Sequence, residues 1–162
     1  MSQKTVGNLF VIGQFALLAV LLILPQGSAW PSGEPVATMG YALNLVGMAI
    51  VIFAIASLGK SLTANPVPLE EATLKTTGLY AVVRHPIYFG FILAASGLTL
   101  KCGSWVSLAV FGGLVLLLNF KARFEERLLI AKYDGYLAYA SKVGRLVPGL
   151  GRLRVDANKA RN

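Results

Sequence analysis

The sequence predicts an all-α integral membrane protein, with about four transmembrane helices in one domain of residues 1–162. Of its residues, 56% are hydrophobic and only 14% are charged, and the mean hydropathy is +0.66. A soluble domain of this size needs more polar surface to cover its core. The chain also contains several apolar runs near the ~20 residues with which a helix crosses a bilayer. These observations favour a membrane-embedded helical bundle.

Four apolar stretches are the candidate spans, and we expect them at residues 6–24, 36–58, 87–100 and 105–120. The third of these is short. Only "KCGS" separates the third from the fourth, so these two are expected to form a tight antiparallel hairpin. The first stretch is expected to remain in the mature protein, because its apolar run exceeds the roughly 7–15 residues of a signal peptide and three more spans follow.

The net charge of +8 is distributed unevenly along the chain. When four spans are threaded from an inside N-terminus, fourteen of the fifteen basic residues fall on the inner side and only Lys101 falls outside. This asymmetry predicts a multi-pass protein with both termini in the cytosol, and the short tails favour a prokaryotic plasma membrane. The basic tail from residue 144 either rests against anionic headgroups or serves only as a topological signal. A nucleic-acid partner is not expected, and the oligomeric state is not indicated.

Several function classes find no support in the sequence. Every Asp and Glu lies outside the four apolar cores, whereas a proton-coupled pump is expected to hold a buried carboxylate. There is no paired Cys/His spacing for zinc, no Walker loop and no GxGxxG, so no metal site is expected. Cys102 is the only cysteine and has no assigned role.

Small residues within the spans predict close helix packing rather than ligand binding. The main positions are Gly40, Gly47, Gly90, Gly97, Gly112 and Gly113.

The stretch "VVRHPIYFGF", residues 82–91, holds the only histidine of the chain. A residue before proline favours extended backbone, and proline suits the first helical position, so a helix is expected to begin close to Pro86. Its free N–H groups, together with Arg84, form an anion site at the inner interface. His85 can donate or accept a proton near neutral pH, and Tyr88 follows within the first turn. The alternative is that Arg84, His85 and Tyr88 only anchor a helix end at the membrane surface.

The segment 121–162 is expected to continue the fourth span as a cytosolic helical segment. Asp134-Gly135 predicts a break, after which a helix resumes and Gly144 caps it. Glu125 and Glu126 are the only acids directly after a span. They are either functional or a solvated pair balanced by neighbouring arginines on the helix.

Taken together, "TTGLYAVVRHPIYFG", a membrane hairpin, and "FEERLL" followed by "VGRLVP" resemble the isoprenylcysteine carboxyl methyltransferase and phospholipid methyltransferase superfamily. The resemblance covers roughly residues 58–152. It implies an integral-membrane methyltransferase that uses S-adenosylmethionine, with the C-terminal segment completing the cofactor site at the cytosolic face.

The resemblance also implies roles for individual residues. It implies catalytic roles for Arg84 and Glu126, because an arginine can orient a carboxylate and a glutamate suits a sulfonium or an amine. We expect the start of the third span and the acidic pair to converge on one polar pocket beneath the headgroups. The implied cofactor-binding residues are Tyr80, His85, Pro86, Tyr88, Glu125, Glu126 and Tyr136. No role follows for Tyr133, where the spacing is tighter than the family's, or for Tyr139.

The methyl acceptor is expected to be a lipophilic molecule or lipid. Carboxyl O-methylation ranks first, N-methylation of a phospholipid amine headgroup second, and methylation of a small thiol third. The alternative is a non-catalytic membrane assembly or transport protein that retains the scaffold. The absence of acids from the spans counts against transport, and the presence of Arg84, His85 and the Glu pair counts against a degenerate relative.

Overall fold

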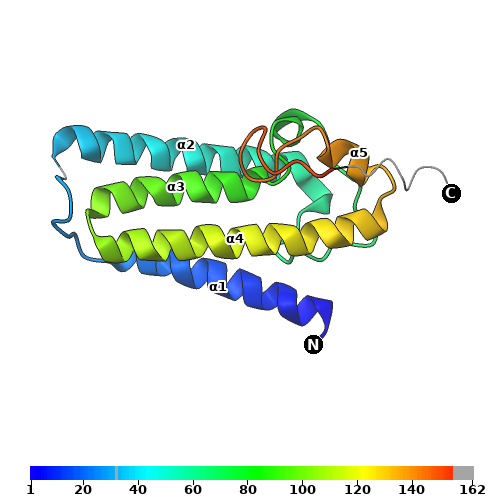
Figure 1. The fold of residues 1–162 in the computed structure, drawn as a ribbon, viewed down its shortest axis with the longest axis horizontal. Coiled ribbons are helices and arrows are strands. Elements are labelled where there is room, and N and C mark those ends of the chain that lie inside the picture. Colours follow the sequence, from blue (N-terminus) through cyan, green and yellow to red (C-terminus); the bar gives the residue numbers. More distant parts are fainter. Residues whose placement is uncertain (32, 155–162) are drawn as a thin grey trace.

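The computed structural model describes residues 1–31 and 33–154. The end of the basic tail, residues 155–162, lies outside the described residues, so its expected contact with headgroups stays a prediction. The helices run side by side along the long axis, in the order α2, α3, α4, α1 across the bundle (Figure 1). They are α1 (Gln3–Ile23), α2 (Glu34–Leu58), α3 (Pro86–Cys102), α4 (Trp105–Lys132) and the short α5 (Tyr136–Ala140), with 3₁₀ turns η1 (Gly59–Ser61) and η2 (Gly78–Ala81).

The expected all-α membrane architecture is confirmed. By length and composition, α1, α2 and α4 are long and apolar enough to cross a membrane, whereas α3, with 17 residues, is shorter. The fourth span and its continuation form one uninterrupted helix of 28 residues. The start of α1 and α5 lie at the same end of the bundle (Figure 1). Which side of the membrane this end faces remains a prediction.

Local sequence sets the boundaries of α3. The helix begins at Pro86, with His85 outside it in a non-helical conformation, as the residue before a proline requires. It stops at Gly103, which adopts the left-handed conformation (φ 62°) that favours glycine. Ser104 then caps α4 by accepting a hydrogen bond from the backbone N–H of Val106. The tight hairpin between these two helices is therefore confirmed.

Helices α2 and α3 approach each other through glycines. A Cβ added at Gly47 would lie 2.4 Å from the backbone nitrogen of Ala94, and one added at Gly97 would lie 2.3 Å from the carbonyl oxygen of Gly40. A Cβ at Gly90 would lie 2.7 Å from the carbonyl oxygen of Gly47. The backbones are thus in direct contact, and the packing role expected for these four glycines is confirmed.

The same expectation is wrong for Gly112 and Gly113 of α4. A Cβ added at either position meets nothing within 4 Å among the described residues. These two glycines lie on a face of α4 where the described part of the chain places no neighbouring backbone.

We expect Gly97→Ala to lower the free energy of unfolding by about 1–3 kcal/mol, the usual cost of forcing an extra methyl group into a packed interface. Gly112→Ala is the matched control, since its methyl group has room and alanine favours the helix by roughly 0.5–1 kcal/mol. Thermal unfolding in one detergent measures both. Equal melting temperatures for the two variants would contradict the close packing of α2 on α3.

The chain between α2 and α3 crosses the end of the bundle that carries α5. The Asn65 amide donates to Asn8 Oδ1 of α1 at 2.7 Å. Further along, Lys132 Nζ of α4 donates to the carbonyl oxygen of Glu70 at 2.9 Å, and the Tyr133 hydroxyl donates to that of Ala72. These contacts hold residues 65–72 of the connection against α1 and the end of α4.

The C-terminal segment departs from its expected form. The helix that resumes after the break ends at Ala140 rather than near Gly144. The backbone N–H groups of Arg84 and His85 bond to the carbonyl oxygens of Gly144 (2.8 Å) and Arg145 (3.1 Å). Because this stretch pairs with the chain before α3, it leaves the helical conformation.

Candidate functional site

The start of α3, the second half of α4 and the C-terminal segment meet at one point. His85 Nδ1 lies 3.6 Å from Glu125 Oε2, and His85 Nε2 lies 3.5 Å from Glu126 Oε1. The His85 ring also stacks on Tyr88, with centroids 5.2 Å apart and planes 3° from parallel. The structure thus brings together the histidine and the acidic pair, which are separated by the hairpin in sequence.

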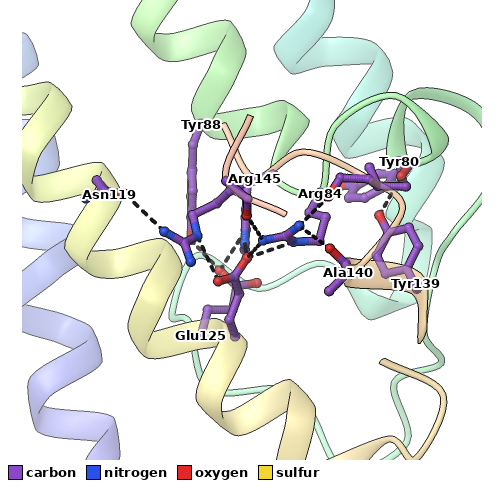
Figure 2. A network of polar contacts seen from close by, with 12 residues as sticks. Tyr80, Arg84, Tyr88, Asn119, Glu125, Tyr139, Ala140 and Arg145 are labelled. Atoms are coloured by element: carbon purple, nitrogen blue, oxygen red, sulfur yellow. Dashed lines mark hydrogen bonds and ion pairs between the residues drawn. The ribbon is translucent and has the colours of Figure 1, made fainter. Parts of the chain in front are cut away.

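The buried side chain of Arg84 links α4 to the C-terminal segment. Its Nε and Nη2 donate to Glu126 Oε1 at 2.8 Å and 2.5 Å. The remaining N–H groups donate to backbone carbonyls of the C-terminal segment, those of Ala140, Val143 and Gly151. Figure 2 shows the guanidinium group of Arg84 pointing at the carbonyl of Ala140. All five of its N–H groups are engaged, and none is left for a ligand.

The other carboxylate oxygen of Glu126 accepts a hydrogen bond from a second arginine. Arg145 Nε donates to Glu126 Oε2 at 2.8 Å, and Arg145 Nη1 reaches Asn119 Oδ1 at 3.5 Å (Figure 2). Glu126 is only 3% exposed. We name Arg84, Glu126 and Arg145 the clamp, because they join α3, α4 and the C-terminal segment. Sequence reasoning missed Arg145: it lies in "VGRLVP", but no spacing indicated its pairing with Glu126.

The clamp corrects several expectations. Arg84 was expected to offer an anion site and to act on the reactants, but its donors are consumed by protein oxygens. The alternative of a membrane-surface anchor is also wrong, since Arg84 is 4% exposed. Glu126 is no solvated partner of neighbouring helix arginines, since it pairs with Arg84 and Arg145. The catalytic roles expected for Arg84 and Glu126 stay predictions, and the structure shows the two buried side chains paired with each other.

A cavity of about 270 Å³ opens beside the clamp. This volume is just below the ~300–1,000 Å³ of typical ligand pockets. Six residues expected to bind a cofactor line it: Tyr80, His85, Pro86, Tyr88, Glu125 and Tyr136. Glu126 does not, because it lies behind them in the clamp. Apolar side chains form the opposite wall, among them Phe15, Ile55 and Phe91.

Two buried polar atoms at this cavity have no hydrogen-bond partner among the described residues. They are Nε2 of His85 and the hydroxyl of Tyr136. Leaving a buried polar group unpaired costs about 1–3 kcal/mol, so such groups usually serve a ligand or a water molecule. The carboxylate at the cavity is Glu125, which is 26% exposed at its side chain and accepts a hydrogen bond from the Tyr88 hydroxyl at 2.7 Å.

The protonation states follow from burial and charge. Burial opposes protonation of His85, but the carboxylates of Glu125 and Glu126 outweigh it and raise the pKa of His85 above its ordinary value. Burial also raises the pKa of Tyr80 and Tyr136, and raises the pKa of Tyr139 to about 12. The three tyrosines are therefore hydroxyl donors at neutral pH, and the imidazole tends toward its charged form.

His85 should make stability depend on pH. Because its pKa is raised in the folded state, the charged imidazole contributes stability that is fully present below about pH 6.5 and lost as pH rises through the folded pKa. We expect the melting temperature of the wild type to fall as the pH rises above about 6.5, and we expect a smaller fall in His85→Asn. Unfolding curves from pH 5.5 to 9 measure this. Identical slopes for both proteins would show that the imidazole is not charged by its neighbours.

Lys121 and Gln14 also line the cavity, and sequence reasoning gave neither a role. Lys121 was expected at the start of the cytosolic segment, yet it is 2% exposed and lies against α1. Its Nζ donates to Gln14 Oε1 at 2.8 Å and sits 4.9 Å from the centre of the Tyr88 ring. A glutamine within an apolar span was the one available indication of a polar contact there.

Comparison with known proteins adds relatives. Residues 36–135 match the family model described as phospholipid methyltransferase. The protein-S-isoprenylcysteine O-methyltransferase of Schizosaccharomyces pombe is 41% identical over 82 residues, which are 49% of this chain and 34% of the relative. The methanethiol S-methyltransferase of a Pseudomonas species is 28% identical over 154 residues, which are 86% of this chain and 58% of the relative. Methanethiol S-methyltransferase 2 of Bradyrhizobium diazoefficiens is 34% identical over 94 residues, which are 57% of this chain and 36% of the relative. The chain thus spans 34–58% of the length of these relatives.

Proposed function

The chain belongs to the phospholipid methyltransferase family, and from this premise we propose that it transfers a methyl group from S-adenosylmethionine to a lipophilic acceptor at the cytosolic membrane face. The observation that carries the proposal is the cavity beside the clamp. There the Tyr136 hydroxyl, which has no hydrogen-bond partner among the described residues, lies with the His85 imidazole and the carboxylate of Glu125 beside apolar side chains. The names of the relatives support a methyl transfer.

The residues at the cavity fit the polar groups of S-adenosylmethionine. Its positive groups, the amine and the sulfonium, suit the carboxylate of Glu125, and its acceptor atoms suit the Tyr136 hydroxyl and the imidazole of His85. When bound, this cofactor supplies a methyl group already activated by positively charged sulfur. Pro86 contributes by fixing where α3 begins, which places His85 and Tyr88 on the same wall.

The chain's own residues have three tasks in such a transfer. The clamp holds α3, α4 and the C-terminal segment in one geometry, so that the groups at the cavity keep their positions. Apolar side chains such as Phe15 and Phe91 keep water away from the reacting atoms. A carboxylate acceptor needs no proton removed, whereas an amine or a thiol must lose one. Glu125 would take the proton in that case.

We rank carboxyl O-methylation of an apolar acceptor first. N-methylation of a phospholipid amine headgroup is the second candidate, supported by the family description. S-methylation of a small thiol is the third, supported by two relatives named methanethiol S-methyltransferases. The uneven distribution of basic residues supports a cytosolic position for the cavity end of the bundle.

The experiment is incubation of purified protein with methyl-labelled S-adenosylmethionine and a total lipid extract, an apolar carboxylic acid or an alkyl thiol. O-methylation gives a methyl ester that releases labelled methanol in alkali, N-methylation leaves the label on a non-volatile amine headgroup after the same treatment, and S-methylation gives a thioether. We expect the alkali-labile product. Absence of label from all three fractions, while the protein remains folded, would refute the proposed function.

A further inference from the structure

Lys121 is a buried cation that makes no ion pair with the residues of the clamp. It is 2% exposed, and no ion pair joins it to an acidic side chain within the described ranges. Of the three N–H groups of its ammonium, one donates to Gln14 Oε1. Gln14 is itself 3% exposed, and both residues line the cavity.

The ammonium lies where the polar and apolar walls of the cavity meet. On α4, Lys121 precedes Glu125 by one helical turn, on the side toward the middle of the span. It faces the Tyr88 ring of α3, with Nζ 4.9 Å from the ring centre. The next layer is apolar, where Phe15 of α1 and Phe91 of α3 contact edge to face, with centroids 6.5 Å apart.

Physical chemistry gives such a cation a strong preference for an anion. A buried charge without a counter-ion is costly, and in a membrane protein it usually marks a functional site. A lysine near the end of a span ordinarily extends its ammonium to the membrane surface, yet Lys121 turns inward to Gln14. The neutral amide oxygen of Gln14 orients the ammonium without neutralising it.

We propose that Lys121, oriented by Gln14, forms an anion subsite for the head of the acceptor, a carboxylate or a thiolate carried on an apolar body. This rests on the proposed function and names the substrate class. The apolar body would lie along Phe15 and Phe91, and the anionic head would lie at the Lys121 ammonium. Among the lysines and arginines that line the cavity, Arg84 has no free N–H for this task and Lys75 is exposed, which leaves Lys121 as the buried one with N–H groups to spare.

The test compares matched charged and neutral ligands by their effect on the melting temperature, so that it needs no turnover. N-acetyl-S-farnesylcysteine is compared with its methyl ester, and 4-dodecylbenzenethiol with 4-dodecylphenol, both pairs at pH 7.5, where the arenethiol is ionised and the phenol is neutral. We expect wild type to bind one of the charged ligands at least tenfold more tightly than its neutral match. Lys121→Met should abolish that preference. Arg123→Met, which removes an exposed cation from the same helix, should retain it.

Lys121→Gln is the second variant, because it keeps a polar contact to Gln14 if methionine prevents folding, and it should show the same loss. A charged-ligand preference that persists in both lysine variants, or that wild type lacks for both ligand pairs, overturns the subsite. Binding of S-adenosylhomocysteine is measured in parallel. If it binds while no charge preference exists, the subsite fails and the methyltransferase proposal stands. If the preference exists and depends on Lys121 but S-adenosylhomocysteine does not bind, the anion subsite stands and the methyltransferase proposal fails.

Discussion

Replacing Arg84 with methionine is expected to lower the free energy of unfolding by about 3–5 kcal/mol and to abolish cofactor binding. The loss of one partner from a buried ion pair typically costs this much, because the other charge is left uncompensated. Here Glu126 Oε1 would keep only the more distant His85, Arg145 would remain on Oε2, and the carbonyls of Ala140 and Val143 would lose their donors. Thermal or denaturant unfolding in detergent, with S-adenosylhomocysteine binding measured alongside, gives both values.

Two further variants define the role of Arg84. Arg84→Lys keeps the charge but lacks the planar fork of donors, so it should recover only a minor part of the stability. Arg123→Met removes an exposed arginine and should behave as wild type. Full stability of Arg84→Met, or full rescue by lysine, would show that the guanidinium does not hold the three segments together.

Replacing Glu125 with glutamine is expected to weaken S-adenosylhomocysteine binding by roughly 10- to 100-fold, while the unfolding free energy changes by less than about 1 kcal/mol. A hydrogen bond to a charged group contributes about 1.5–3 kcal/mol, and the amine of the ligand would lose such a partner. The fold should tolerate the change because Glu125 is partly exposed, and a glutamine oxygen still accepts from the Tyr88 hydroxyl. Isothermal titration and thermal unfolding measure the two quantities.

Glu126→Gln is the matched comparison for this prediction. The two acids are adjacent in sequence, yet Glu126 is buried between Arg84 and Arg145. Its replacement leaves the buried guanidinium group of Arg84 and the partly buried one of Arg145 without a carboxylate, so stability should fall by several kcal/mol. If both substitutions affect stability and binding alike, the division of the pair into a ligand group and a clamp group is wrong.

The helices were predictable because their determinants are local. Hydropathy marked the spans, the proline at 86 marked the start of α3, and Gly103-Ser104 marked the hairpin. The C-terminal helix was overestimated because its periodic pattern continues past Ala140, whereas hydrogen bonds to the chain before α3 end it. Glycine content alone also did not distinguish Gly97, which contacts a neighbouring backbone, from Gly112, which does not.

The site was predictable only as a set of residues. The resemblance placed His85 and the acidic pair in one pocket. Which partner each charged side chain bonds to, however, depends on contacts between residues far apart in sequence. The backbone carbonyl of Gly151 accepts a hydrogen bond from Arg84, and Gln14 of α1 accepts one from Lys121. No spacing in the sequence encodes these contacts, since they arise only when the C-terminal segment and α1 pack against α4.

The central claim is that the cavity beside the clamp binds the methyl-donor cofactor, and binding of S-adenosylhomocysteine to purified wild type tests it most directly. At a ligand concentration about 100 times Kd, binding should stabilise the fold by about 2.7 kcal/mol, seen as a rise in melting temperature of several degrees. Tyr136→Phe, which removes a buried hydroxyl that has no partner among the described residues, should weaken binding about tenfold. The claim would be contradicted if about 1 mM ligand did not raise the melting temperature of wild type. It would also be contradicted if the ligand raised the melting temperatures of Tyr136→Phe and Glu125→Gln as much as that of wild type.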